Sequence, residues 1–168
     1  MGAKSLSKRK NWQNQTSKSA KKAENTSISL LRESRENKYN FHVQPMLSFG
    51  DWNFKPEVLI VNPKNDKMVV LDNKNGNNGG NAHERSYRYF SPMFLKSPYQ
   101  PFLLFTGKTF ASEEPYYVEN KSGKRTRINP EKYRNEFKEL IPEENYSILN
   151  LDSSNLEEVV AKLDRLLE

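Results

Sequence analysis

Two carboxylates and an amine near the middle of the chain have the types and the spacing for metal-assisted phosphodiester hydrolysis. Glu57 precedes the apolar run 58–61, and Asp72 and Lys74 follow the apolar run 68–71. Asp72 and Lys74 are two residues apart, so on an extended chain their side chains project from the same face. Carboxylate oxygens are ligands that Mg²⁺ prefers, and a nearby cation can orient the attacking water or the phosphate. On spacing alone, ordinary surface charges at a hairpin end explain the pattern better, because such short motifs recur by chance.

The apolar runs beside these residues have the composition of paired β-strands. Residues 58–61 and 68–71 are short and rich in β-branched side chains, and the link between them is rich in turn-forming residues. This pattern predicts a β-hairpin. The hairpin places Glu57 at the start of one strand and Asp72 at the end of its neighbour. Two carboxylates and the Lys74 amine are therefore expected to converge.

A glycine-rich segment follows the hairpin. Residues 75–80 are all Asn or Gly, which tolerate positive φ angles, so we expect a flexible loop whose backbone can approach a ligand closely. Asn81 then occupies the position of a helix N-cap, with Glu84 three residues later, and this predicts a helix that runs toward Pro92. A capping box explains Asn81 and Glu84 without any ligand, and on chemistry alone it is the stronger explanation.

A specific motif begins in this segment. It reads Gly80-Asn81-Ala82-His83-Glu84-Arg85-Ser86 and is followed by Phe90, Pro92 and the strand-like run 101–107. This order resembles the EcoRI/MunI group of type II restriction endonucleases, within the PD-(D/E)xK nuclease superfamily, and is most similar to its MunI-like members. Residues 2–7 and 11–13 resemble the amino end of those enzymes. The resemblance covers the start and roughly the middle third of the chain.

The resemblance implies an activity and a site. Members of this group cleave both strands of DNA at a short palindrome and read its AATT centre with this motif. Carried over residue by residue, the resemblance implies that Glu57 and Asp72 bind Mg²⁺ and that Lys74 completes the catalytic site. The residues that it assigns to DNA are Gly80, Asn81, Ala82, His83, Glu84 and Arg85. A further active-site acid, Glu33 or Glu36, stays open.

Three positions depart from the family pattern. The family usually has Asp at the first acidic position and Glu at the second, whereas this chain has Glu57 and Asp72. Each exchange moves a carboxylate by about one methylene, and Mg²⁺ demands near-ideal octahedral geometry, so a slow enzyme, a different metal preference or loss of activity stays open. MunI-like enzymes also carry an arginine just before the motif and use it on the outer C·G pair, where this chain has Gly79. We therefore expect an AATT-centred site whose outer pair is relaxed or read differently from CAATTG.

The composition fits a soluble protein with a polyanionic partner. The chain has 168 residues, a net charge of +6 and no cysteine, which excludes disulfides and Cys-ligated zinc. No apolar run approaches the length of a membrane span, and the amino end lacks the apolar core of a signal peptide, so we expect a cytoplasmic protein without membrane contact. Residues 1–25 are expected to form a basic, mobile arm that either follows phosphates or only aids solubility. Residues 26–168 are expected to form a single nuclease domain.

The remaining patterns predict the elements around the hairpin. Helices are expected over 28–36, 130–140 and, after a Ser154 cap, 156–167, and strands over 102–105, 116–118 and 146–151. The stretch 39–54 is expected to be irregular, and its lone His42 to be structural. The basic cluster 121–127 suits DNA backbone phosphates, and a solvated loop explains it equally well.

The patterns predict an α/β fold, and the resemblance implies a restriction-endonuclease-like core, in which a central mixed β-sheet carries the acids and the lysine and is flanked by helices. A palindrome in double-stranded DNA presents the same half-site twice, and two symmetric subunits match it, so we expect a homodimer. The resemblance also implies a cognate DNA methyltransferase in the host. Two other functions stay open. One is a non-catalytic, basic nucleic-acid-binding protein, and the other is a repair or recombination nuclease that cuts at a DNA structure.

Overall fold

The structure is a computed structural model that describes residues 18, 22, 26–150 and 155–168. Its strands are β1 (Asn40–Val43), β2 (Leu47–Phe49), β3 (Trp52–Phe54), β4 (Val58–Val61), β5 (Met68–Asn75), β6 (Tyr99–Thr106), β7 (Tyr116–Glu119), β8 (Arg125–Ile128) and β9 (Tyr146–Leu149). Its helices are the 3-10 helices η1 (Ala82–Phe90) and η2 (Glu143–Asn145) and the α-helices α2 (Pro92–Leu95), α3 (Lys108–Ala111), α4 (Pro130–Leu140) and α5 (Leu156–Leu167), and residues 26–35 are helical as well. Most of the predicted basic arm and the predicted Ser154 cap lie outside the described residues.

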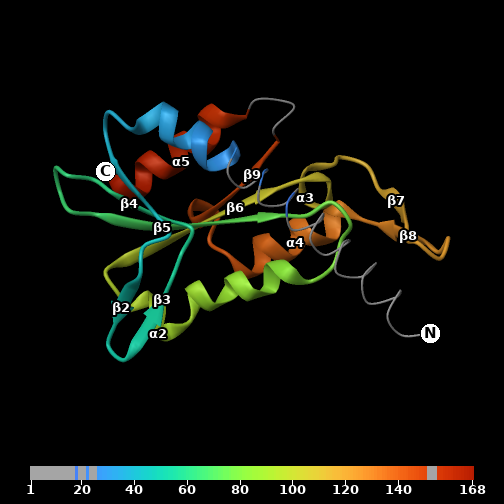
Figure 1. The fold of residues 1–168 in the computed structure, drawn as a ribbon, viewed down its shortest axis with the longest axis horizontal. Helices are drawn as coiled ribbons and strands as arrows, with labels where there is room; N and C mark the ends of the chain where they lie inside the picture. The colour runs from blue at the N-terminus through green and yellow to red at the C-terminus, as the bar shows by residue number, and fades with distance from the viewer. Residues whose placement is uncertain (1–17, 19–21, 23–25, 151–154) are drawn as a thin grey trace.

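A five-stranded mixed sheet forms the centre of the molecule (Figure 1), with strand order β1-β4-β5-β6-β9. β1, β4 and β5 pair antiparallel, whereas β5, β6 and β9 pair parallel. The predicted hairpin is confirmed, because β4 pairs with β5 and Val58 lies opposite Leu71. β5 continues beyond Leu71 to Asn75, which lies opposite Thr106 of β6. This extension places both Asp72 and Lys74 on β5.

Helices cover both faces of this sheet, which confirms the predicted fold class. Residues 26–35 and α5 pack on one face, where Leu71 and Leu163 belong to one buried cluster. The helices η1, α2, α3 and α4 pack on the other face, where Val70 and Phe137 belong to a second cluster. Figure 1 shows α5 and α4 on opposite sides of the sheet. Within the described ranges, every helix is too short or too polar to cross a membrane.

The sequence predicted an irregular stretch over residues 39–54. This prediction is wrong, because the stretch contains three short strands. β1 pairs antiparallel with β4 at the edge of the central sheet, and β2 pairs with β3 in a separate ribbon. The rings of Trp52 and Phe54 stack with their centroids 4.8 Å apart, and both pack edge-on against Phe94 of α2. Contacts with a helix far along the chain support this ribbon, so the local sequence pattern does not reveal it.

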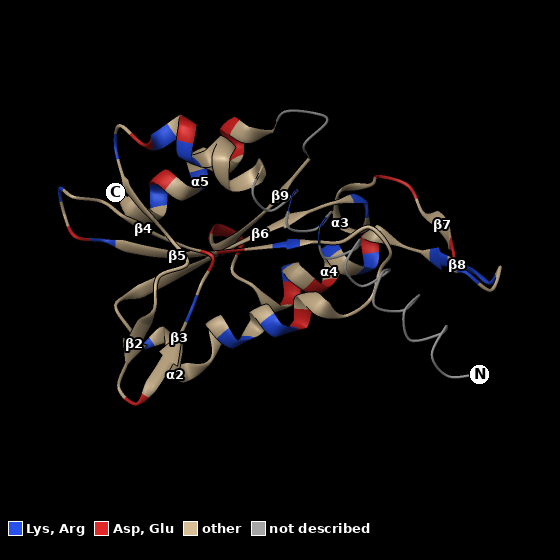
Figure 2. Ribbon diagram, viewed as in Figure 1, with Lys and Arg blue, Asp and Glu red and all other residues tan. Residues whose placement is uncertain are grey.

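A second antiparallel ribbon, formed by β7 and β8, extends beyond the central sheet (Figure 1). Tyr117 lies opposite Arg127 in this ribbon. Figure 2 shows lysine and arginine gathered on β8 and on the turn that leads into it. The strand predicted over 116–118 is therefore confirmed, and the second half of the basic cluster 121–127 proves to be its partner strand.

Hydrogen-bonded ion pairs fasten the first helical segment to α5. Arg35 Nη2 lies 2.8 Å from Asp164 Oδ2 and Arg35 Nε lies 3.0 Å from Asp164 Oδ1, while the hydroxyl of Tyr39 donates to the same Oδ1 at 2.9 Å. Burial acts to raise the pKa of Asp164, but the hydrogen bonds from Arg35 and Tyr39 and the nearby positive charges outweigh it, so the pKa is lowered. The charged form of Asp164 therefore stabilises the packing of these two helices.

Candidate functional site

Glu57 and Asp72 meet where β4 begins and β5 approaches its end. The backbone amide of Glu57 donates to Oδ1 of Asp72 at 3.2 Å, and the amide of Asn73 donates to Oε2 of Glu57 at 2.7 Å. Each carboxylate therefore accepts a hydrogen bond from the strand of the other. Asp72 is only 5% exposed, so its carboxylate is held in place by burial as well as by this bond.

Lys74 completes the group on the same strand. Its Nζ lies 3.5 Å from Oδ2 of Asp72, and its side chain remains 26% exposed. Asp72 and Lys74 alternate with Asn73, so both project from the face of β5 that carries Val70. The structure thus brings together the two acids and the amine that the sequence singled out.

Tyr89 of η1 adds a hydroxyl to this site that the sequence did not predict. It is fully buried, and burial, together with the negative charge of Asp72, raises its pKa to about 12. Nη2 of Arg88 donates to the Tyr89 hydroxyl at 3.2 Å, and this bond acts against the shift. Because Tyr89 and Arg88 belong to η1, the helix that carries the motif also borders β5, the strand of Asp72 and Lys74.

The donor chemistry of Glu57 and Asp72 fits a hard divalent cation. The two side chains offer four carboxylate oxygens, the type of ligand atom that Mg²⁺ prefers. Each oxygen has two lone pairs, so an oxygen that accepts from a backbone amide can also contact a cation. In the described part of the chain, no third His, Asp or Glu groups with these two acids at ligand distances. Glu33 and Glu36, the open alternatives, are both exposed and belong to the segment that packs on the opposite face of the sheet.

The predicted helix after the glycine-rich loop exists and begins at Ala82, but it is a 3-10 helix and lacks the predicted cap. Asn81 has φ −118° and ψ 15°, outside the extended backbone of an N-cap, and its side chain makes no capping hydrogen bond. The capping-box interpretation of Asn81 and Glu84 is therefore wrong. Asn81, Glu84 and Arg85 are exposed, so three polar side chains of the motif are open to a partner.

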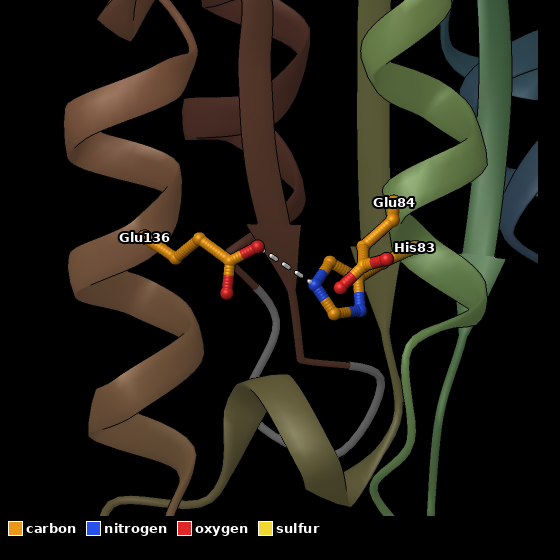
Figure 3. A group of neighbouring side chains, drawn as sticks. All are labelled: His83, Glu84 and Glu136. Carbon is orange, nitrogen blue, oxygen red and sulfur yellow. Dashed lines mark hydrogen bonds and ion pairs between the residues drawn. The ribbon is translucent and has the colours of Figure 1, made fainter.

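His83 supports the motif from beneath, and Figure 3 shows its ring facing Glu136 of α4. Its Nε2 lies 3.2 Å from Glu136 Oε1, which also accepts the hydroxyl of Tyr87 at 2.6 Å. Burial acts to raise the pKa of Glu136, but the bonds from Tyr87 and His83 outweigh it, so the pKa is lowered. His83 is 2% exposed and packs edge-on against Phe137, so it joins η1 to α4 and its side chain does not reach the surface. The exposed Glu84 lies close to this pair, since its carboxylate and the His83 and Glu136 ligand atoms lie within 4.8 Å of one another.

Gly79, just before the motif, and Gly80, its first residue, adopt backbone angles that favour glycine. Gly79 has φ +75° and Gly80 has φ +94°, as expected for the predicted loop. A Cβ atom at Gly79 would lie 2.7 Å from Cδ1 of Ile128, whereas one at Gly80 would meet open space. A side chain at position 79 is therefore disfavoured by the backbone angle and requires the Ile128 side chain of β8 to shift.

Comparison with known proteins agrees with this architecture. No protein-family model matches the chain, and no curated protein matches it. Among solved structures, the chain is similar to MunI restriction endonuclease, crystallised in complex with cognate DNA, with a TM-score of 0.51 and 18% sequence identity over 78% of this chain and 83% of that chain. The chain has a restriction-endonuclease-like fold.

The restriction-endonuclease-like fold was predicted from the acid-and-lysine hairpin and the motif after it, and at 18% identity the likeness is one of fold. The roles of single residues must therefore be argued from their chemistry. Sequence reasoning missed two site residues, Tyr89 beside Asp72 and Glu136 beside His83. The four-residue spacing of His83 and Tyr87 indicates a shared inward face of the helix, but nothing local identifies α4 as the partner.

Proposed function

We propose that the protein is a type II site-specific deoxyribonuclease that hydrolyses one phosphodiester bond in each strand of a short palindrome with an AATT centre. The observation that carries the proposal is the position of two groups at one end of the sheet. Asp72 and Lys74 lie 3.5 Å apart near the end of β5, and the exposed Asn81 and Arg85 follow on the segment that leaves that strand. MunI, whose fold is similar, was solved with its cognate DNA.

The catalytic group is preorganised by its own backbone. Glu57 and Asp72 would hold Mg²⁺ through carboxylate oxygens; when bound, the ion lowers the pKa of a coordinated water and stabilises negative charge on the phosphate. The amides of Glu57 and Asn73 fix the two carboxylates on their strands. Lys74, partly exposed beside Asp72, orients the attacking water or a phosphate oxygen.

The motif reads the inner bases. Adenine presents N7 as an acceptor and its N6 amino group as a donor in the major groove. The amide of Asn81 can bond to both, the carboxylate of Glu84 can accept from an amino group, and Arg85 can donate to N7. Gly80 and Ala82 let the backbone approach the bases closely, while His83 holds η1 against α4.

Cations on the β7–β8 ribbon supply the sequence-independent part of binding. Lys124, Arg125 and Arg127 are exposed there, and the guanidinium of Arg125 lies 4.7 Å from the centre of the Tyr117 ring, which orients it. With the net charge of +6, this surface suits DNA phosphates. We also propose that a homodimer acts on the palindrome in the cytoplasm and that a cognate methyltransferase protects host DNA.

The test is to incubate the pure protein with Mg²⁺ and a long DNA duplex. Discrete fragments that share AATT at their ends are expected, and EDTA should prevent their formation. Asp72→Ala should abolish them, whereas Asp51→Ala, which removes an exposed acid from the turn between β2 and β3, should not. A smear or cuts at DNA structures would indicate a nuclease without sequence specificity, and intact DNA that is nevertheless bound would indicate a non-catalytic DNA-binding protein.

A further inference from the structure

The loop in front of the motif is bonded to two elements outside it. The carbonyl of Gly76 accepts from the amide of Thr109 in α3 at 2.8 Å, and Oδ1 of Asn77 accepts from the amide of Lys108 at 3.0 Å. From the β7–β8 ribbon, the hydroxyl of Tyr116 donates to the carbonyl of Asn77 at 2.6 Å. The loop is therefore fastened by α3 and by β7 before the motif begins.

Two hydroxyl groups, those of Thr109 and Tyr116, connect Gly79 to Asn77 within the loop. The amide of Gly79 donates to Oγ1 of Thr109 at 2.9 Å, and this Oγ1 lies 3.3 Å from the hydroxyl oxygen of Tyr116. Because a tyrosine hydroxyl has one proton and the carbonyl of Asn77 can only accept, Tyr116 gives its proton to Asn77 and Thr109 gives its own to Tyr116. Burial raises the pKa of Tyr116 while the bond with Thr109 acts to lower it, as a donor to the phenol oxygen should. The bonds thus run in one direction, from the Gly79 amide through both hydroxyls to the Asn77 carbonyl.

A side chain of β8 confines the same loop from another side. A Cβ atom at Gly79 would lie 2.7 Å from Cδ1 of Ile128 and 3.2 Å from the hydroxyl of Tyr133. Thr109 is 1% exposed and Ile128 is 6% exposed, so this contact is shielded from water. The hydrogen bonds of Thr109 with Gly79 and with Tyr116 are partly buried, and linked hydrogen bonds of this kind make a segment more rigid. The backbone two residues before Asn81 is therefore enclosed between the hydroxyl pair and the ribbon.

We propose that Thr109 and Tyr116 are positioning residues for sequence recognition, because they hold the loop before the motif in a fixed place relative to the β7–β8 ribbon. The inference rests on the proposed function. The ribbon carries Arg125 and Arg127 on its exposed surface, and its inner side carries Tyr116 and Ile128 against the loop. When the ribbon contacts phosphates, the motif is then held at a fixed position relative to the bases.

The experiment compares the binding of variants to a duplex with the cognate site and to one without it, in Ca²⁺ to prevent cleavage. Thr109→Val and Tyr116→Phe remove one hydroxyl each and nearly keep the side-chain volume. Each should weaken binding to the cognate duplex by about tenfold or more, as small misplacements of recognition groups do, and should change non-specific binding by less than about twofold. Thr109→Ser keeps the hydroxyl and should retain discrimination.

Tyr99→Phe is the matched control. Tyr99 lies on β6, outside the loop and the β7–β8 ribbon, and its hydroxyl makes no hydrogen bond within the described residues, so this variant should bind as the wild type does. A second measurement, amide hydrogen exchange of Gly79 by NMR, should show faster exchange in Thr109→Val and a rate near that of the wild type in Thr109→Ser.

The outcomes separate this inference from the proposed function. A wild-type protein without preference for any sequence would overturn both. A wild type that discriminates, with Thr109→Val and Tyr116→Phe that discriminate equally well, would overturn the positioning role alone. Equal losses on both duplexes, or a lowered unfolding temperature that Thr109→Ser shares, would show that the hydroxyls only stabilise the fold and would also overturn it.

Discussion

The backbone amide of Glu57 lies 3.2 Å from Oδ1 of Asp72, and the carboxylate of Glu57 accepts in turn from the amide of Asn73. The longer acid, at the start of β4, thus reaches across to β5, and the shorter acid, on β5, meets the backbone of β4. Relative to the family pattern, the two exchanges change side-chain length in opposite directions. Each carboxylate of this inverted pair is fixed by a backbone amide at or beside the other acid.

Removing the short acid or the amine should stop hydrolysis without preventing recognition. We expect Asp72→Ala and Lys74→Ala each to lower the cleavage rate by at least about a hundredfold, because both groups act on the phosphate and its attacking water rather than on bases. Binding to the cognate duplex, measured by fluorescence anisotropy, should change little. Asp51→Ala is the matched control and should cleave normally. Cleavage near the wild-type rate in both site variants would place the active site elsewhere.

Arg85 should contribute to specific binding far more than to non-specific binding. A well-formed contact to a base edge is worth about 1–3 kcal/mol of discrimination, so Arg85→Ala should weaken binding to the cognate duplex by roughly that amount. Arg165→Ala removes an exposed arginine from α5, on the opposite face of the sheet, and serves as the control. An equal loss on cognate and random duplexes would mean that Arg85 contacts only phosphates.

The sequence predicted those parts of the molecule that depend on neighbouring residues. The β4–β5 hairpin, the loop with positive φ at Gly79 and the helix after Asn81 all follow from local composition. Contacts between distant segments were not predictable, because the partner of His83 is Glu136, 53 residues away, and Tyr89 reaches Asp72 only once η1 packs on the sheet. The cap failed for a similar reason: the backbone of Asn81 is set by the preceding loop, which α3 and β7 hold, and not by the helix that follows.

Stability at low pH should depend on Asp164. Its pKa is lowered in the folded protein, so its contribution is fully present above the unfolded-state value, near 3.8, and is lost as the pH falls through the lower folded value. At pH 7 we expect Asp164→Asn to reduce the free energy of unfolding by about 2 kcal/mol, since charged hydrogen bonds to Arg35 are lost. Urea titrations should show this difference shrinking below about pH 4. Asp66→Asn, at an exposed turn position, is the control, and a difference independent of pH would contradict the assignment.

Gly79, just before the motif, and Gly80, its first residue, should differ in their tolerance of alanine. Both have positive φ, so each substitution should destabilise the fold by about 1 kcal/mol or more. At Gly79 the added Cβ would also lie 2.7 Å from Ile128, whereas at Gly80 it meets open space. Urea unfolding should therefore show a larger loss for Gly79→Ala than for Gly80→Ala. The double variant Gly79→Ala with Ile128→Val should recover part of the excess, and equal losses in the two single variants would mean that the loop moves away from β8 freely.

The base pairs outside AATT should not be read from position 79. The MunI-like enzymes that the motif resembles use an arginine just before it on the outer C·G pair, and here Gly79 has no side chain that could reach a base edge. The structure adds that an arginine there would be strained, because of the positive φ and the contact with Ile128. The side-chain oxygen of Asn77 accepts from the amide of Lys108, whereas the exposed Asn78 is the polar side chain next to Gly79.

We therefore expect digestion of a library with AATT in every flanking context, followed by sequencing of the ends, to show cuts at several outer pairs. Asn78→Ala should change the preference among them if that amide reads the outer pair. Cutting confined to CAATTG, with other flanks slower by about a hundredfold, or about 2.7 kcal/mol, would show that another group performs the reading lost at Gly79.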